Sequence, residues 1–300
     1  MEEIERIHER LQNIKTIEPI LSALRTVAGA TWRGALNRME RVRRYAAQLQ
    51  EVLTAVAPYA ASGPLTRDTA SAPNVEDALL VIAAERGLCG GFNRTILTAA
   101  EELIDKERSS GRSPQLLTLG EQARRRLDQL GIPILRSDHL PVTSLPPYTR
   151  AEELAEWALK AHEAGIIGGL SIIHNRYLSA MAYIPRVRQV LPTQPVPHDE
   201  TEPTWPPPII DGDPTEIHAL TLKRHVTAQV YAAVIESAAC EQAARFQTME
   251  RSSQNAERLI EELSLRYHQA RQESITQEML DLAVGAGLVA GGRQEERYHG

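Results

Sequence analysis

The stretch IERIHERLQNIKTIEPILSALRTVAGA, residues 4–30, decides the fold. It begins a pattern in which an apolar residue recurs every seven positions, namely Ile7, Ile14, Leu21, Ala28, Ala35, Val42, Leu49 and Val56. Apolar residues sustained at this spacing are typical of a helix that supercoils with a partner helix. The pattern predicts one helix over 3–57, roughly 80 Å long at the usual helical rise. Pro19 lies inside it and predicts a kink, because proline removes one backbone hydrogen bond.

A second long helix is predicted over 216–288. Its apolar or small residues step by three or four positions, as in Ala256, Leu259, Leu263, Tyr267, Ala270 and Ser274. The proline-rich stretch PTQPVPHDETEPTWPPPIIDGDP, residues 192–214, precedes it and is predicted to be a linker or surface loop. We expect this helix to pair antiparallel with residues 1–58. Because it is the longer of the two, part of it should project and need another protein to bury its apolar end.

Between the helices, residues 75–195 have a different character. ALLVIAA, residues 78–84, is a short apolar run of the kind that forms a strand buried on both faces. Helical and strand patterns then alternate, which is typical of an α/β layer with parallel strands, and the last two strands are predicted to form a hairpin. Thr149 is the expected N-cap of the third helix. The predicted fold class is α/β with long helices: an antiparallel coiled coil joined to a Rossmann-like α/β domain.

Composition narrows the range of functions. The 300 residues are 42% hydrophobic but only 4% aromatic, which suits long helices better than β-sandwiches. A net charge of −6 argues against a nucleic-acid-binding protein with a basic surface. The two cysteines lie far apart without zinc-ligand spacing, so no metal site is expected. No stretch is apolar enough to span a membrane, so a membrane role would act through partners.

The glycine-rich stretch AAERGLCGGFNRTI, residues 83–96, is a candidate site. It has neither the lysine of a P-loop nor the glycine spacing of a dinucleotide-binding loop. Gly87, Gly90 and Gly91 favour a tight strand-to-helix turn, with a reactive thiol at Cys89 as the alternative. His174, in HNRY, is interpreted as a satisfied surface histidine rather than a catalytic base.

The segment YHQARQESITQEML, residues 267–280, is a stronger candidate. It carries arginine, glutamine, serine, threonine and glutamate where the second helix is predicted to project. A solvated helix surface would more often carry lysine and glutamate pairs. The composition favours a polar contact face for another protein.

Several of these motifs resemble one family, the γ subunit of F-type ATP synthases. ERGLCGGFN, residues 85–93, is similar to the family's signature near its first strand. ESAACEQAARFQTMERSSQNAERLIEELSLRYHQARQESITQEM, residues 236–279, is similar to its C-terminal signature almost residue for residue. Residues 4–30 match its N-terminal helix in spacing, and NRYLSAMAYIPRVRQVLP, residues 175–192, is similar to the hairpin that closes its α/β domain.

The resemblance implies a rotor subunit that couples ion flow to ATP synthesis or hydrolysis and has no catalytic residue, metal or cofactor of its own. Its implied partners are the α and β subunits of the α3β3 ring, the ε subunit and the membrane c-ring. It implies a peripheral location on the cytoplasmic face of the bacterial inner membrane. The implied β-subunit contacts are Arg271, Gln272, Thr276 and Glu278, with Arg245 at a position where the family keeps an arginine. Gly87, Cys89, Gly90 and Gly91 are implied to form a structural turn.

The chain departs from the family pattern at a few positions. Glu18 and Pro19 replace a usual Gln-Lys pair, and Glu85 replaces aspartate before the signature arginine. The small apolar residues of 282–292 would suit a bearing against which the helix end turns. The tail, residues 289–300, ends in the charged segment RQEERYHG, residues 293–300. Two alternatives remain at this point: a coiled-coil scaffold protein, or an α/β enzyme with helical arms. The enzyme would need polar groups that converge at the strand C-termini, and the sequence shows no such cluster.

Overall fold

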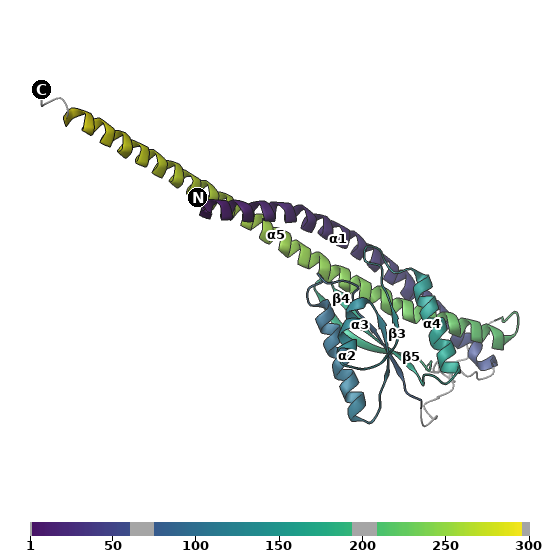
Figure 1. Ribbon diagram of the computed structural model, residues 1–300. Helices are drawn as coiled ribbons and strands as arrows, with labels where there is room; N and C mark the ends of the chain where they lie inside the picture. Colours follow the sequence, from purple (N-terminus) through teal and green to yellow (C-terminus); the bar gives the residue numbers. More distant parts are fainter. Residues whose placement is uncertain (1, 61–74, 194–208, 296–300) are drawn as a thin grey trace. The chain divides into compact units, whose positions relative to one another are not determined.

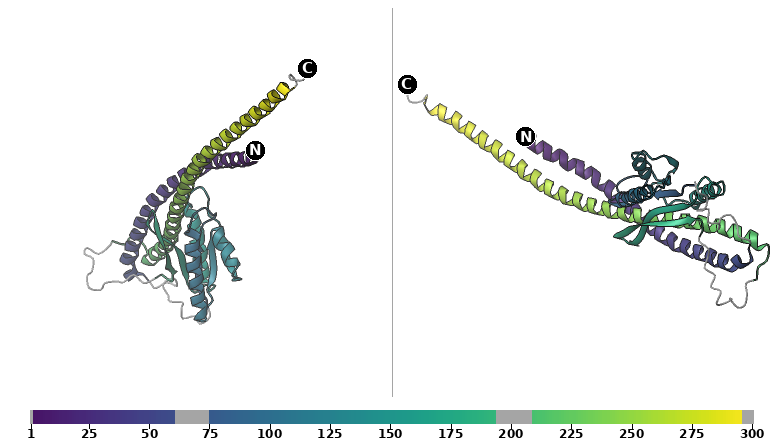
Figure 2. Two further views of the ribbon diagram at one scale, coloured as in Figure 1. Left: turned by 90° about the vertical axis from the view of Figure 1, so that its left-hand side faces the viewer. Right: turned by 90° about the horizontal axis from the view of Figure 1, so that it is seen from below.

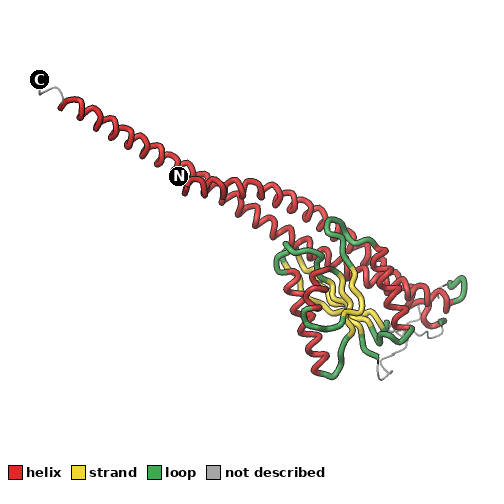
Figure 3. Tube along the Cα trace, viewed as in Figure 1, coloured by secondary structure: helices red, strands yellow, loops and turns green. Residues whose placement is uncertain are grey.

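The computed structural model describes residues 2–60, 75–193 and 209–295, with side chains described as far as residue 285 in the last range. Its elements follow the order α1 (Glu2–Val56), the short 3-10 helix η1 (Ala57–Tyr59), β1 (Ala78–Ile82), α2 (Phe92–Ser109), β2 (Gln115–Leu119), α3 (Glu121–Asp128), β3 (Ile134–Asp138), α4 (Tyr148–Glu163), β4 (Leu170–Ser179), β5 (Ala182–Leu191) and α5 (Pro214–Glu295). Figures 1 and 3 show the two long helices and the single sheet. The predicted fold class is confirmed.

The chain groups by contact into two compact units. Unit 1 comprises Met1–Leu24 and Met249–Gly300, and unit 2 comprises Arg25–Thr248. Each unit therefore contains part of α1 and part of α5. The division into separate coiled-coil and α/β domains remains a prediction, and the proline-rich segment lies largely outside the described residues.

The sheet of unit 2 has five strands in the order β3-β2-β1-β4-β5. β1 is central and pairs in parallel with both β2 and β4, so that Leu80 lies opposite Leu117 on one side and Ile172 on the other. β5 runs antiparallel to β4, which confirms the predicted hairpin. All five residues of β1 are buried. This explains why the strand is a continuous apolar run instead of alternating with polar residues.

Helices cover both faces of this sheet. One face packs against α2 and α3 through a core that includes Leu79, Val81, Ile96 and Leu127. The other face packs against α4 and against the parts of α1 and α5 that belong to unit 2, through a core that includes Leu80, Ala155, Val42, Val230 and Val234. The α/β layer and the helix pair of unit 2 consequently share one core.

Within unit 2 the two long helices run antiparallel and side by side (Figure 2). The Trp32 and Phe246 rings are 6.0 Å apart between centroids. The Arg43 guanidinium lies 3.0 Å from the Glu236 carboxylate. Residues 233–240 of α5 are all buried, because the sheet and α1 together enclose this stretch on every side.

In unit 1 the beginning of α1 pairs antiparallel with α5. The hydroxyl of Ser253 donates to the Glu18 carboxylate over 3.3 Å, and the rings of His8 and Tyr267 are 5.0 Å apart between centroids. Glu18 is thus held by a hydrogen bond across the pair. α1 remains one continuous helix through Pro19.

One local prediction was wrong. α4 begins at Tyr148, its N-cap is Pro147, and no side chain caps it. Thr149 therefore lies inside the first turn. Pro147, two residues before Thr149, already has the extended backbone that an N-cap requires, with φ −72° and ψ 155°, so the helix starts two residues earlier than the threonine suggested.

Candidate functional site

The polar segment of α5 lies in unit 1, around and beyond the contact between Tyr267 and His8. The residues from 271 to 285 are exposed except for Ser274, which is half-buried. Arg271, Gln272, Thr276 and Glu278 all lie on this stretch. Arg271 forms no ion pair with any other described residue. The predicted contact residues are accordingly open to solvent or to a partner.

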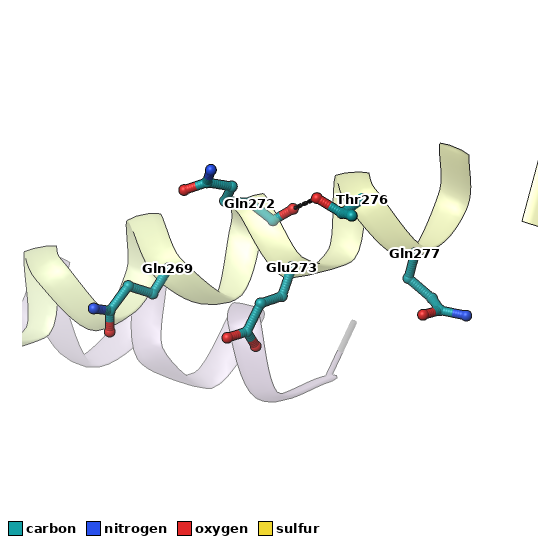
Figure 4. Close-up of a pocket in the computed structure, with 5 residues that line it drawn as sticks. All are labelled: Gln269, Gln272, Glu273, Thr276 and Gln277. Carbon is teal, nitrogen blue, oxygen red and sulfur yellow. Dashed lines mark hydrogen bonds between the residues drawn. The ribbon is translucent and has the colours of Figure 1, made fainter. Parts of the chain in front are cut away.

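A pocket of about 490 Å³ lies along one side of this segment and is lined by Gln269, Gln272, Glu273, Thr276 and Gln277. Figure 4 shows these side chains on successive turns of α5, with Gln269, Glu273 and Gln277 pointing downwards and Gln272 and Thr276 above them. Their spacing of three and four residues places them on one helix face. Gln272 and Thr276 thus belong to a stripe of amide, hydroxyl and carboxylate groups, a chemistry suited to directional hydrogen bonds with a partner.

Arg271 and Glu278 lie on a different face of the same helix. They are seven residues apart, which is close to two full turns, so they share a side with each other and not with the Gln272 stripe. The four predicted contacts therefore divide between two faces. One flat partner surface would reach only one of these faces, whereas partners on several sides of the helix could reach both.

The polar groups of this segment also bond within the helix. The Thr276 hydroxyl donates to the Gln272 carbonyl over 2.8 Å, and the Gln277 amide donates to Asp281 over 3.1 Å. The Ser274 hydroxyl donates to Glu278 over 3.4 Å. These local bonds help to hold a helix whose described side chains are all exposed from residue 275 onwards. They leave the guanidinium of Arg271 and the side-chain amide of Gln272 available.

Arg245 is placed differently from the other predicted contacts. It belongs to unit 2, where its guanidinium lies 2.7 Å from the Glu241 carboxylate with both side chains 12% exposed. It also donates to the carbonyl of Gly87 over 3.4 Å. Burial raises the pKa of Glu241, and the charge of Arg245 offsets this only in part. Arg245 is thus committed to contacts inside the chain.

The glycine-rich stretch forms a compact turn between β1 and α2. Gly90 has φ +55°, and an added Cβ would stand 3.0 Å from the Thr248 hydroxyl, so glycine suits both the backbone and the space. Gly91 is the N-cap of α2. Asn93 bridges the turn, since its carbonyl accepts from the Ala84 amide over 3.0 Å and its amide donates to Cys89 Sγ over 3.3 Å.

Cys89 is poorly suited to nucleophilic chemistry. It is 2% exposed and packs with Phe92, Cys240 and Ala244. Burial raises the pKa of its thiol to about 11, with the charge of Glu241 adding to the shift. A thiol with this pKa is protonated at neutral pH and is a weak nucleophile. The geometry favours the structural interpretation of the turn over the reactive-thiol alternative.

Comparisons with known proteins place the chain in a family. A family model described as ATP synthase matches residues 3–288. The ATP synthase gamma chain of Fuscovulum blasticum is 30% identical over 290 residues, covering 95% of this chain and 99% of the relative. That of Dinoroseobacter shibae is 31% identical over 293 residues, with 95% and 99% covered.

The chain belongs to the ATP synthase gamma chain family. Its role is that of the central-stalk subunit of an ATP synthase. The fold is similar to that of a chain in the cryo-EM structure of Euglena gracilis mitochondrial ATP synthase, OSCP/F1/c-ring, with a TM-score of 0.67, 20% identity, and 97% and 95% of the two chains covered. A chain of the Tetrahymena thermophila mitochondrial ATP synthase central stalk and c-ring gives a TM-score of 0.56 at 20% identity.

In this member of the family, polar groups do converge at the carboxyl ends of the strands, which the sequence did not reveal. Glu85, after β1, accepts backbone hydrogen bonds from Glu121 over 3.2 Å and from Leu140 over 3.0 Å. Its other oxygen lies 2.8 Å from His139 Nδ1. Both carboxylate oxygens are therefore used to fasten the ends of the three strands β1, β2 and β3 together. The residues lie far apart in sequence, so only the parallel sheet brings them together.

The interpretation of His174 as a surface residue was wrong. Its side chain is 1% exposed, and Nε2 lies 3.2 Å from Glu236 Oε2 on α5. Burial alone would raise the pKa of Glu236, but the His174 hydrogen bond and the charges of His174 and Arg43 outweigh it, so the pKa is lowered. His174 directly follows the apolar residues of β4, and Glu236 lies within an apolar run of α5. These two positions were the sequence features from which the buried pair could have been predicted.

Proposed function

We propose that this chain transmits rotation between a membrane ion-driven ring and a catalytic ring of three α and three β subunits, and that it carries no catalytic residue itself. The observation that carries the proposal is the end of α5. From residue 271 to 285 the helix presents polar and apolar side chains that are all exposed except for that of Ser274. A helix exposed on all sides in this way needs partners on more than one side.

The chemistry of this segment suits a shaft that turns inside a ring. Arg271, Gln272, Thr276 and Glu278 are proposed to contact β subunits on more than one side of the helix through hydrogen bonds, which are directional and can be broken and remade. Large apolar side chains also lie exposed on the same stretch, namely Ile275, Met279, Leu280, Leu282 and Val284. Apolar contact is non-directional, so these residues are proposed to form a surface that slides against the ring.

The remaining partners follow from the same proposal. Unit 2, with its sheet and buried turn, is proposed to contact the ε subunit and the c-ring. Arg245 is proposed to act mainly by holding the turn, because its guanidinium is engaged by Glu241 and Gly87. Among the described residues, no helix combines the length and apolar character needed to cross a membrane. Attachment to the cytoplasmic face of the bacterial inner membrane is proposed to come through the complex.

A double variant, Arg271→Ala with Gln272→Ala, tests the contact face. We expect assembled complexes that carry it to lose at least about half of their ATP-driven ion pumping, because charge-assisted and amide hydrogen bonds contribute roughly 1–3 kcal/mol each. The assay is ATP-driven quenching of a pH-sensitive dye in inverted vesicles, with subunit stoichiometry measured on the purified complex. Unchanged pumping by a fully assembled double variant would remove these residues from the mechanism.

The chain offers a matched control on the same helix. Gln254 and Arg258 are also exposed residues of α5 in unit 1, and each hydrogen-bonds to a neighbour along the helix, Gln254 to Glu250 and Arg258 to Asn255. Gln254→Ala with Arg258→Ala removes the same two residue types outside the proposed contact face. Pumping should stay near the wild-type level in this control. Equal losses in both double variants would mean that helix stability, rather than contact with β, is what the assay reports.

A further inference from the structure

A second pocket lies within unit 2, between the helix pair and the β4–β5 hairpin. Its volume is about 480 Å³, a size typical of small-molecule sites. Its lining is dominated by cationic and amide groups, and it contains Arg43, Gln50, Arg176, Arg186, Arg188, His225, Gln229 and Glu236 together with small or apolar residues of α1 and α5. We call this pocket the arginine cavity.

The strand register explains why arginines gather there. In the antiparallel pair, His174 lies opposite Arg186 and Ile172 lies opposite Arg188. Alternate residues of a strand point to the same face, so Arg176 shares the face of Ile172 and His174. Ile172 packs in the core against the helix pair. The arginines at the outer part of the hairpin therefore face the same side, towards α1 and α5.

The charges in the arginine cavity are not balanced. Among the described residues, Glu236 is the one acidic residue of its lining, and its two oxygens are taken by Arg43 at 3.0 Å and His174 at 3.2 Å. Arg176, Arg186 and Arg188 have no ion pair with any residue that the structure describes. Burial, followed by the repulsion of Arg186, lowers the pKa of the Arg188 guanidinium. Arg176 and Arg186 are exposed and partly screened by solvent, but the repulsion that Arg188 meets would be relieved by an anion bound among the three.

His225 adds a polar group at the side of the helices. It is 7% exposed, and its Nε2 lies 2.5 Å from the side-chain nitrogen of Gln229. Burial lowers the pKa of its imidazole, so the ring is neutral at pH 7. The arginine cavity thus combines the positive charge of its arginines with a buried, neutral imidazole.

We propose that the arginine cavity binds two or more phosphate groups at once. Guanidinium groups suit phosphate oxygens, because their planar N–H forks bond two oxygens at once. Three guanidinium groups without an ion pair to any described residue match the charge of several phosphates better than that of a single carboxylate. The phosphates could belong to a free oligophosphate or to phospholipid headgroups, and the test below separates these sources.

The test measures arginine modification by phenylglyoxal in the full chain, kept at submicromolar concentration and read residue by residue by peptide mass spectrometry. Sodium tripolyphosphate is the first probe. The second is vesicles of phosphatidylcholine with and without phosphatidylglycerol. We expect tripolyphosphate to slow modification of Arg186 and Arg188 at least about five-fold in a saturable manner, and higher salt to weaken the effect. Arg150, an exposed residue paired with Glu153, is the internal control and should react equally in all samples.

A double variant, Arg186→Gln with Arg188→Gln, should weaken the protection of Arg176 by tripolyphosphate about ten-fold or more, since two charge-assisted contacts are lost. Arg150→Gln should leave this protection unchanged.

Protection only by phosphatidylglycerol vesicles assigns the phosphates to lipid. Absence of saturable protection by either probe at low salt overturns the proposal. So does protection that appears only after Asp199→Asn, Glu200→Gln and Glu202→Gln are combined, because the chain's own acidic segment would then be the occupant.

Discussion

The interpretation of the glycine-rich turn can be tested through the reactivity of its cysteine. With a pKa of about 11, against 9.0 for an unperturbed thiol, Cys89 carries about a hundred-fold less thiolate at neutral pH, because each pKa unit is a factor of ten. Its 2% exposure restricts access further. We therefore expect iodoacetamide at pH 7.5 to alkylate Cys89 at least about a hundred-fold more slowly than a free exposed cysteine.

The assay follows alkylation of the intact chain by mass spectrometry, in buffer and in concentrated urea. Cys240 is an internal comparator, since it is fully buried and burial raises the pKa of its thiol as well. Both cysteines should react slowly in buffer and rapidly in urea. If Cys89 reacts in buffer within about ten-fold of an exposed thiol while Cys240 does not, the turn is open and its thiol is accessible, and the structural interpretation fails.

A substitution completes the test. Cys89→Ala removes the thiol but keeps a small apolar side chain among Phe92, Cys240 and Ala244. We expect assembly and ATP-driven pumping to be retained, with a loss of stability of about 1–2 kcal/mol for the lost sulfur contacts and the acceptor of Asn93. Folded, assembled complexes that carry Cys89→Ala but cannot pump would assign the thiol a direct role and refute the reasoning.

Three further predictions concern unit 2 and are measured by urea denaturation followed by circular dichroism. Phe92 is fully buried and packs edge-on against Tyr183, so Phe92→Ala should cost about 3–5 kcal/mol and the more conservative Phe92→Leu less than about 1.5. Gly120 has φ +99° and its Cβ would overlap the carbonyl of Ala83, so Gly120→Ala should cost about 3 kcal/mol or more. Folding lowers the pKa of Glu236 below its usual value of 4.5. The ionised carboxylate therefore stabilises the folded state above pH 4.5, and this stabilisation is lost as the pH falls through the lower folded pKa. The difference in unfolding free energy between wild type and Glu236→Gln should shrink on acidification from about pH 6 to about pH 3.

Periodic patterns in the sequence predicted the fold well, because they follow from burial. The heptad positions of α1 from Ala28 to Val56 are buried, and those before them are half-buried. β1 is buried along its whole length, as its continuous apolar run predicted. Such patterns depend only on which face of an element meets a core, and this information is local.

Residues whose role depends on distant partners could not be placed in this way. His174 is held by Glu236, and Arg245 by Glu241 and the carbonyl of Gly87. Each looks like an ordinary polar residue within its own segment. A surface that binds a partner and an ion pair inside the chain use the same polar side chains. Composition therefore predicted the exposed segment around Arg271, but it could not show that Arg245 forms its contacts inside the chain.

The two ends of α5 show why exposure, and not composition, identifies the partner-binding part. Residues 233–240 are apolar on nearly every side and are buried, because the sheet and α1 enclose them. Residues 279–285 also carry apolar side chains that are spread around the helix instead of forming one stripe, yet every one of these residues is exposed. Apolar surface on all sides of a helix is stable only when something surrounds it. No described part of this chain surrounds the helix beyond residue 278. This exposure is what supports the proposal that other subunits bury the end of the stalk.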